Sequence, residues 1–189
     1  TVQLLSSFDA LQVNDGVNLE TRRVFAEIMR TNPLFYALYI GMPNGDFYEL
    51  INLDAHPIIR EQLNASHLDR WVIIAINGQG ELRQRKQSYF DDEFTLRVSQ
   101  IESSEYDARV RPWFINANGA TVSKTEPYLF QHLQSPGQTY SIKLPETGAV
   151  LALDIALSSL SDYLVMQGED DNTASQKKIY LYKQSGELI

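Results

Sequence analysis

The chain has 189 residues, a formal net charge of −8 at pH 7 and no cysteine. This length predicts one domain, or one domain with a fragment of a second. The absence of cysteine excludes disulfides and thiol chemistry, and the acidic balance argues against nucleic acid or an anionic membrane surface as a partner.

Membrane and secretion signals are missing from the sequence itself. No stretch approaches the roughly 20 apolar residues of a membrane span, and no signal-peptide pattern or initiating Met is present. We therefore expect these residues to be part of a longer protein.

The first 32 residues predict an N-terminal helical segment. Apolar residues have helical spacing over residues 4–11, and residues 14–16 (Asn-Asp-Gly) interrupt them. Asn18 can cap a second helix that ends before Asn32-Pro33. Its apolar residues are Val24, Phe25, Ile28 and Met29. This helix is expected to cover the sheet.

A series of hairpins follows. We predict strands at residues 34–40, 47–53, 70–76, 81–89 and 94–101, with an Asn-Gly turn at residues 43–46. For residues 94–101, which are amphipathic, a helix is the alternative. Residues 121–130 predict a strand with an edge or bulge at Pro127. Residues 138–144 and 149–157 form the last hairpin, and a helix covers residues 158–166. These elements predict an α+β domain with an antiparallel sheet.

The segment from Tyr106 to Ala117 concentrates aromatic and cationic residues around one proline. Pro112 disfavours helical backbone at Arg111 and is suited to the first position of a short helix, which Asn118-Gly119 would end. Arg111 and Trp113 are thereby displayed at a corner of the chain. Arginine offers a fork of donors suited to a carboxylate, although an ion pair holding the loop in place is an equally simple interpretation.

The strand at residues 149–157 has one bulky apolar face and one face of small residues with a single carboxylate, Asp154. A carboxylate in such a strand costs several kcal/mol unless a cation or several donors satisfy it. One alternative is a salt bridge to Arg109 or Arg111. The other is that Arg111 and Trp113 bind the carboxylate of a free amino acid while Asp154 binds its amine.

Three segments of the sequence together match the pattern of a known family of domains. The sequence Tyr-Asp-x-Arg-x-Arg-Pro-Trp-Phe at residues 106–114, then Thr-Glu-Pro-Tyr at 125–128 and Gly-Ala-Val-Leu-Ala-Leu-Asp-Ile at 148–155, resembles the ligand-binding module of double Cache sensor domains. The resemblance extends from about residue 19 onward. It implies a PAS-like Cache module with a central antiparallel sheet flanked by helices and preceded by an N-terminal helix. It also implies a homodimer contact through this helix, as the alternative to a helix that only covers the sheet.

The resemblance also implies a site and a setting. An amino-acid-binding pattern of this family matches Tyr106, Arg111, Trp113, Tyr128 and Asp154, while Phe114 stands where the pattern has Tyr. Arg111 and Trp113 would hold a carboxylate, and Asp154 and Tyr128 an amine. Phe114 removes one hydroxyl. The implied protein is a bacterial inner-membrane signalling protein whose periplasmic part this is, with membrane spans outside residues 1–189.

The expected organisation has three parts: an N-terminal helical segment (1–32), a membrane-distal ligand-binding module (33–166), and a linker with the start of a membrane-proximal module (167–189). The domain itself is expected not to be an enzyme and to need no cofactor. Its expected output is a conformational signal passed across the membrane to a chemoreceptor, histidine kinase or cyclic-nucleotide enzyme. The alternative is a Cache-like interaction or dimerisation module without a small ligand.

Other chemistry has little support in the sequence. The three histidines are far apart, the acidic runs lack the spacing of a calcium loop, and no nucleophile elbow is present. We therefore expect neither a metal site nor a hydrolase. Trp71, Tyr36, Tyr39 and Tyr48 are interpreted as core residues, with a pocket wall as the alternative for the three tyrosines.

Overall fold

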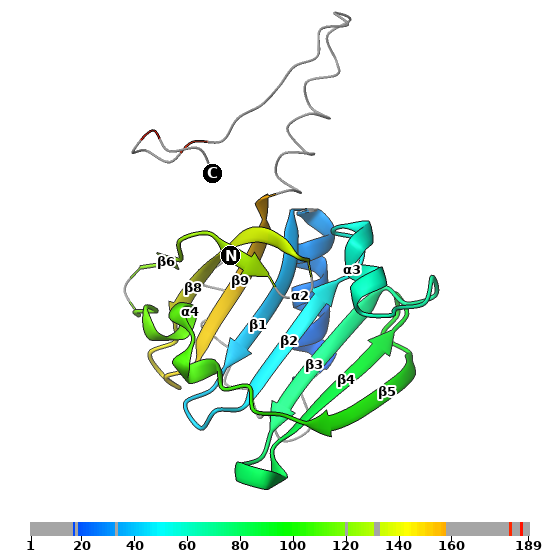
Figure 1. The fold of residues 1–189 in the computed structure, drawn as a ribbon, viewed down its shortest axis with the longest axis horizontal. Coiled ribbons are helices and arrows are strands. Elements are labelled where there is room, and N and C mark those ends of the chain that lie inside the picture. The colour runs from blue at the N-terminus through cyan, green and yellow to red at the C-terminus, as the bar shows by residue number, and fades with distance from the viewer. Residues whose placement is uncertain are drawn as a thin grey trace, which may run out of the picture.

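The computed structural model describes residues 17, 19–32, 34–119, 121–130, 133–157, 182 and 186. Within these residues nine strands form one sheet, in the order β5-β4-β3-β2-β1-β9-β8-β6, with β7 also paired to β8 (Figure 1). The strands are β1 (Phe35–Gly41), β2 (Phe47–Asn52), β3 (Trp71–Asn77), β4 (Gln84–Phe90), β5 (Leu96–Ser103), β6 (Ser123–Lys124), β7 (Tyr128–Phe130), β8 (Ser135–Lys143) and β9 (Val150–Ala156).

All of these strand pairs are antiparallel, so the prediction of an α+β fold built on an antiparallel sheet is confirmed. The helices are α2 (Leu19–Thr31), α3 (Pro57–Gln62) and α4 (Pro112–Ile115), with two 3-10 turns, η1 (Gly80–Leu82) and η2 (Ala108–Val110). No helix among the described residues is long and apolar enough to span a membrane.

Successive hairpins build β1 to β5 as a meander, and β9 then returns to pair with β1. The turn between β1 and β2 contains Gly45 at φ +95°, and the Met42 N–H donates to the Asp46 carbonyl at 2.8 Å. The pairing of β1 with β9 joins residues more than a hundred positions apart. It is this pairing that brings the Asp154 strand beside the first hairpin.

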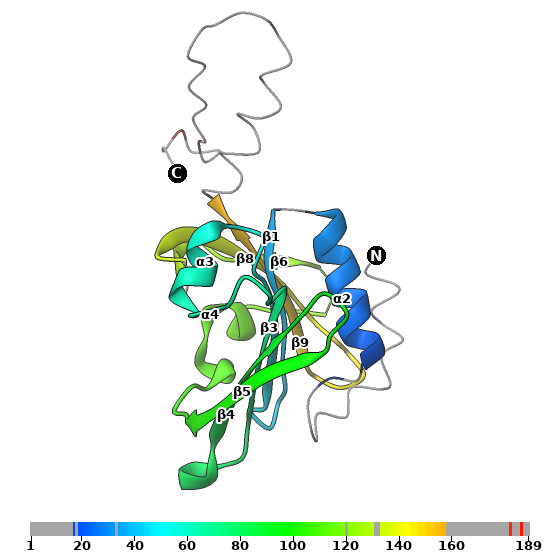
Figure 2. The ribbon, with the colours of Figure 1, turned by 90° about the vertical axis from the view of Figure 1, so that its right-hand side faces the viewer.

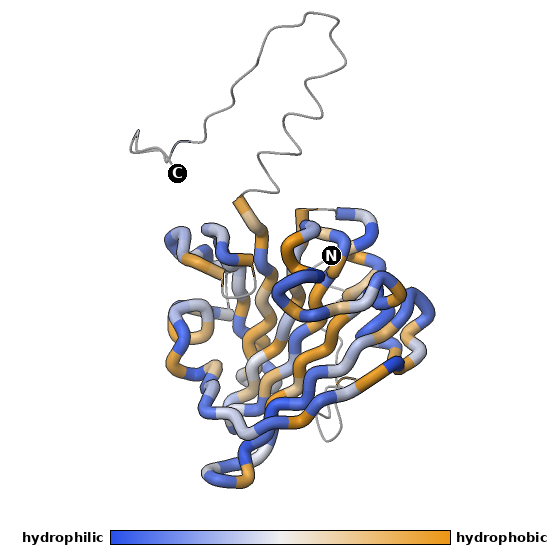
Figure 3. The backbone as a smooth tube through the Cα atoms, turned by 45° about the vertical axis from the view of Figure 1, so that its right-hand side comes forward, coloured by the Kyte–Doolittle hydropathy of each residue, from blue (hydrophilic) through white to orange (hydrophobic). Residues whose placement is uncertain are grey.

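The helix α2 covers one face of the sheet (Figure 2). Its buried residues include Phe25, Ala26 and Met29, which pack with Leu38 and Ile40 of β1 in one apolar cluster. Trp71 belongs to the same cluster and is fully buried, so its interpretation as core is confirmed. In Figure 3 apolar colouring runs along the central strands, while polar colouring is common in the surrounding loops.

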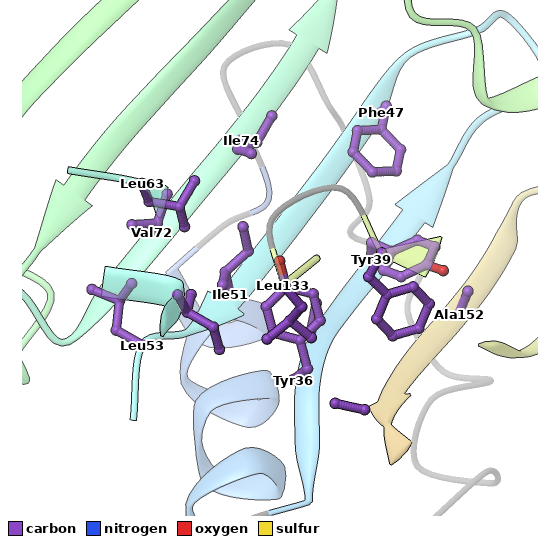
Figure 4. Packing of buried hydrophobic residues seen from close by; sticks show 14 of the residues in the cluster. Tyr36, Tyr39, Phe47, Ile51, Leu53, Leu63, Val72, Ile74, Leu133 and Ala152 are labelled. Carbon is purple, nitrogen blue, oxygen red and sulfur yellow. The ribbon is translucent and has the colours of Figure 1, made fainter. Parts of the chain in front are cut away.

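The opposite face of the sheet forms a second cluster, over which the segments around α3, η2 and α4 lie (Figure 2). Figure 4 shows part of it, with Tyr36, Tyr39 and Phe47 beside Ile51 and Ile74. On β9 the small residues Val150, Ala152 and Ala156 point to this face, whereas Leu151 belongs to the α2 face. The predicted division of this strand into a bulky and a small face is therefore confirmed.

One predicted element was wrong. Residues 121–130 do not form a single strand, because β6 and β7 are separate and the chain between them leaves the ladder. Lys124 pairs with Tyr140 and Tyr128 with Gly137, so one extra residue lies between the two short strands. The break includes Pro127, which has no N–H to donate to β8, and it agrees with the bulge expected there.

Several predictions lie outside the described residues. They are the helix at 4–11, the Asn18 cap, the helix at 158–166 and, apart from residues 182 and 186, the linker with the start of a membrane-proximal module at 167–189. The division of the chain into three parts therefore stays a prediction.

Candidate functional site

A cavity of about 800 Å³ lies on the face of the sheet opposite α2. Its floor comes from β1 to β5 and β9, and its walls come from the end of α3, the corner before α4, and β7. Five of the six predicted site residues line it: Tyr106, Arg111, Trp113, Tyr128 and Asp154. Whether they bind a ligand remains a prediction, but they share one cavity.

The corner before α4 has the predicted geometry. Arg111 has extended backbone (φ −88°, ψ 144°), and Pro112 opens the short helix. The Arg111 guanidinium lies 4.9 Å from the centre of the Tyr106 ring. It makes no ion pair and no hydrogen bond with any residue that the structure describes. A cation so placed at a cavity wall is available to an anionic group.

Trp113 is buried and supports the aromatic wall. Its ring packs edge-on against Tyr39, with the ring centres 4.9 Å apart, and it also contacts Phe47. Burial raises the pKa of the Tyr106 hydroxyl well above its ordinary value, and a hydrogen bond with the Trp113 side chain acts in the opposite direction. Trp113 and Tyr106 thus hold each other in place beside Arg111.

Asp154 is buried at the other side of the cavity, where β9 lies between β1 and β8. Its Oδ1 accepts hydrogen bonds from the Tyr39 hydroxyl at 2.7 Å and from the Thr139 hydroxyl at 2.5 Å. Because Thr139 donates to Asp154, the Tyr128 hydroxyl, 2.7 Å from Thr139, donates to Thr139. The second oxygen, Oδ2, accepts no hydrogen bond from the described residues and is available as an acceptor.

The charge of Asp154 is therefore only partly satisfied by the protein. Burial raises the pKa of this carboxyl to about 7, while the hydrogen bonds from Thr139 and Tyr39 act in the opposite direction. The ordinary value is 3.8, so the empty site disfavours the charged form. A cation bound at Oδ2 would restore the carboxylate.

The salt-bridge alternative for Asp154 was wrong. The Arg109 guanidinium binds Asp107 instead, with Nε 2.9 Å from Oδ1 and Nη2 2.8 Å from Oδ2. Asp107 also accepts the Arg109 N–H and so caps η2. Arg111 makes no bond to Asp154, and the cavity includes both residues in its lining. The two charges are thus separated by open space.

Phe114 differs from the other predicted site residues, because it does not line the cavity. Its ring packs against Trp113, with ring centres 5.6 Å apart, and against the backbone of Gly41. Phe114 follows Trp113 directly in α4, and the two rings contact each other edge-on. Its difference from the family pattern therefore does not remove a hydroxyl from the cavity wall.

The three tyrosines of the first hairpin were interpreted as core residues, with a pocket wall as the alternative. Tyr48 lies in the cluster on the α2 face and is a core residue, as predicted. Tyr36 and Tyr39 are buried in the other core cluster, as predicted, and both also line the cavity, as the alternative interpretation expected. Tyr39 is the more consequential, since its hydroxyl donates to Asp154.

Sequence reasoning missed Glu49 on β2. Glu49 pairs with Tyr39 on one side and Ile74 on the other, and it lines the cavity. Burial, followed by the charge of Asp154, raises the pKa of Glu49 to about 8, while Arg85 acts in the opposite direction. A signal did exist, because Glu49 is a single carboxylate within an apolar strand, as Asp154 is.

The β4 and β5 side of the cavity is polar but internally paired. Arg85 Nη1 lies 2.8 Å from Glu102 Oε1, and Arg85 also donates to the side chain of Gln87. Gln87 in turn bonds to the Tyr89 hydroxyl, which donates to the Leu63 carbonyl at 2.6 Å. This side of the cavity thus has a fixed polar surface with its charges already balanced.

Gly41 allows α4 to lie close to β1. A Cβ at this position would stand 2.8 Å from Trp113 Cη2 and 3.0 Å from Phe114 Cδ2. We predict that Gly41→Ala displaces α4, lowers stability by about 1 to 3 kcal/mol and weakens ligand binding.

Chemical denaturation and ligand titration measure the two effects of Gly41→Ala. Gly119→Ala is the matched control, because its nearest neighbour would be 3.5 Å away. Equal behaviour of the two variants would contradict the positioning role of Gly41.

The fold and cavity define an α+β domain with an open antiparallel sheet, covered by α2 on one face and hollowed on the other. No family model matches the chain. The chain is similar to Adenylate cyclase 1 of Rhizobium meliloti (strain 1021), with 27% identity over 161 residues. The match covers 80% of this chain and 23% of that protein.

A solved structure, described as the extracellular domain of a histidine kinase (soHK1S-Z6), is similar at 17% identity with a TM-score of 0.48. The match covers 99% of this chain and 59% of that one. Both relatives are longer than the present chain.

Proposed function

We propose that this domain is the extracytoplasmic sensor part of a membrane signalling protein, and that its cavity binds an amino acid or a related amine and carboxylate. The single observation that supports the proposal is the arrangement of Arg111 and Asp154. One is an unpaired cation and the other a partly satisfied carboxylate, and both line one cavity with aromatic walls.

The groups at the cavity match those of a free α-amino acid. The ligand carboxylate would lie against the Arg111 fork, and the ammonium group would donate to Asp154 Oδ2. The Tyr128 hydroxyl donates to Thr139, so its lone pairs remain as acceptors for the same ammonium. A cavity of about 800 Å³ also suits a small molecule. Two charge pairs, one of them at the buried Asp154, can support micromolar binding, about −8 kcal/mol.

Signal transmission follows from differential binding, because a ligand shifts only those equilibria whose states it binds unequally. The ligand would contact β1, β2 and β9 from one face, while α2 packs on β1 and β2 from the other. A change in the curvature of these strands would therefore reach α2 directly. The similarity to an adenylate cyclase, of which the chain spans 23%, supports an output domain elsewhere in a longer protein.

A dimerisation module without a ligand is less well supported. That interpretation requires Arg109 or Arg111 to bond directly to Asp154 and fill the space between them. Arg109 is instead bound to Asp107, and the space is open.

The proposal is tested by thermal unfolding of the 189-residue chain with each of the common L-amino acids. At a hundred times Kd, a ligand adds about 2.7 kcal/mol of stability, so at least one amino acid should raise Tm clearly. Arg111→Ala should abolish this rise, because it removes the carboxylate-binding cation.

Arg109→Ala provides the matched control, since it removes an arginine two positions away whose partner is Asp107. It should retain the ligand response. A folded wild-type chain that responds to no amino acid would refute the proposal.

A further inference from the structure

The feature that the proposed ligand leaves unused is Glu49. Among the described residues its carboxylate has neither a hydrogen bond nor an ion pair, although it lies in a mostly apolar strand between Tyr39 and Ile74. Glu49 is half-buried, and a half-buried carboxylate without a partner costs free energy that an apolar residue at the same position would avoid. The presence of Glu49 on the cavity floor therefore favours a role in binding a ligand.

The charges that face the cavity support the same conclusion. Arg85 is neutralised by Glu102 at 2.8 Å, which leaves Arg111 as a cation and Asp154 and Glu49 as two carboxyl groups without a cationic partner among the described residues. A neutral zwitterion would satisfy Arg111 and Asp154 but leave Glu49 uncompensated. A ligand with one further positive charge would balance all three groups.

The strand register sets the separation of the two anionic positions. Asp154 pairs with Ala37 of β1, and Glu49 pairs with Tyr39 two residues further along the same strand. Two strand spacings and two residue rises place their Cα atoms about 12 Å apart. A ligand whose two cations are separated by several methylene groups can therefore place one cation at each carboxylate.

We propose that Glu49 binds the side-chain cation of the ligand, so that the cavity selects amino acids ending in an amine or guanidinium, such as lysine or arginine. This inference rests on the proposed function, because it assumes that Arg111 and Asp154 hold the α-carboxylate and α-ammonium. Glu49 then acts as the residue that determines specificity. The raised pKa of Glu49 agrees with a carboxyl that has no cationic partner until a ligand binds.

Calorimetric titration of the 189-residue chain with L-lysine, L-arginine and L-norleucine tests this selection. L-norleucine has the length of lysine without its charge. The wild-type chain should bind L-lysine or L-arginine at least about ten-fold more tightly than L-norleucine, the effect of one shielded charge pair. Glu49→Gln should remove that preference and leave L-norleucine binding unchanged or tighter.

Glu81→Gln is the matched control, because Glu81 is exposed on η1 and does not line the cavity. It should keep the preference for cationic ligands. Thermal unfolding of Glu49→Gln without ligand verifies that the variant is folded.

The possible failures are distinguishable. If the wild-type chain binds neutral amino acids as tightly as cationic ones, and Arg111→Ala still abolishes binding, Glu49 does not select a cation while the proposed function stands. If Glu49→Gln weakens all three ligands equally, its role is structural and the inference is overturned. If no amino acid binds at all, both proposals fall.

Discussion

An Asp154→Asn chain is expected to be more stable than the wild-type chain at pH 8.5 and to lose its stabilisation by amino acids. Asparagine keeps an oxygen that accepts from Tyr39 and Thr139, so the two hydrogen bonds at 2.7 and 2.5 Å can persist. It removes the buried charge, whose cost is visible in a pKa raised to about 7. The empty fold should therefore gain stability above that pH.

Ligand binding should respond in the opposite direction. Removing one partner of a shielded charge pair costs about 2 to 5 kcal/mol, so affinity for the best amino acid should fall about 100-fold or more. Thermal unfolding with and without ligand measures both effects on one sample. A residue that is only structural would lower both quantities together, so the opposite signs identify a binding role.

Glu146→Gln is the matched control for Asp154→Asn. Glu146 lies in the exposed turn before β9 and does not line the cavity, so this substitution removes one negative charge of the chain outside the site. Glu146→Gln should change neither the stability of the chain without ligand nor its affinity for the amino acid. Loss of the ligand response in both variants would attribute the effect to net charge and not to Asp154.

The empty domain is expected to lose stability as pH rises from about 5 to about 9. In this window the folded chain retains protons on Asp154 and Glu49, whose pKa values are about 7 and about 8, while the ordinary values are 3.8 and 4.5. Because the folded state binds more protons than the unfolded state, raising the pH favours unfolding. Each unit of pKa shift corresponds to about 1.4 kcal/mol, so the change should reach a few kcal/mol.

Burial, modified by the charged groups around the cavity, determines this window. Arg85 opposes the shift of Glu49, and burial is the largest cause for both carboxyls. Asp107 titrates at lower pH, because its hydrogen bond with Arg109 lowers its pKa to about 2. The stability that Asp107 contributes is lost only as pH falls from about 4 toward about 2, outside the window measured.

Ligand binding should have the opposite pH dependence. A cationic ligand requires ionised carboxylates, so its affinity should increase from pH 5.5 to pH 8.5 and binding should release protons. Denaturation curves at several pH values, repeated with Asp154→Asn and Glu49→Gln, measure the contribution of each group. The stability of each variant should depend less on pH than the stability of the wild-type chain does. A profile that the two substitutions leave unchanged would show that other groups control the pH dependence.

Most of the sheet could be predicted because its signals are local. The Asn-Gly turn before β2, the apolar runs of β1 and β3, and the corner at Arg111-Pro112 depend on neighbours within a few residues. The strand at residues 121–130 was predicted incorrectly as one element. Its break depends on where β8 offers partners, and a one-residue shift of register cannot be recognised from one strand alone.

The sequence by itself determined the element order, the alternation that points Asp154 to the small face of β9, and the exposed corner at Arg111. Only the tertiary structure decided which residues meet at the cavity. Pairing of β1 with β9 placed Tyr39 against Asp154, and pairing of β2 with β1 brought Glu49 to the same floor. Phe114 packs beside Gly41 and does not line the cavity. The reason is physical: facing direction follows from a local backbone period, whereas contact across a sheet depends on strand pairing between distant parts of the chain.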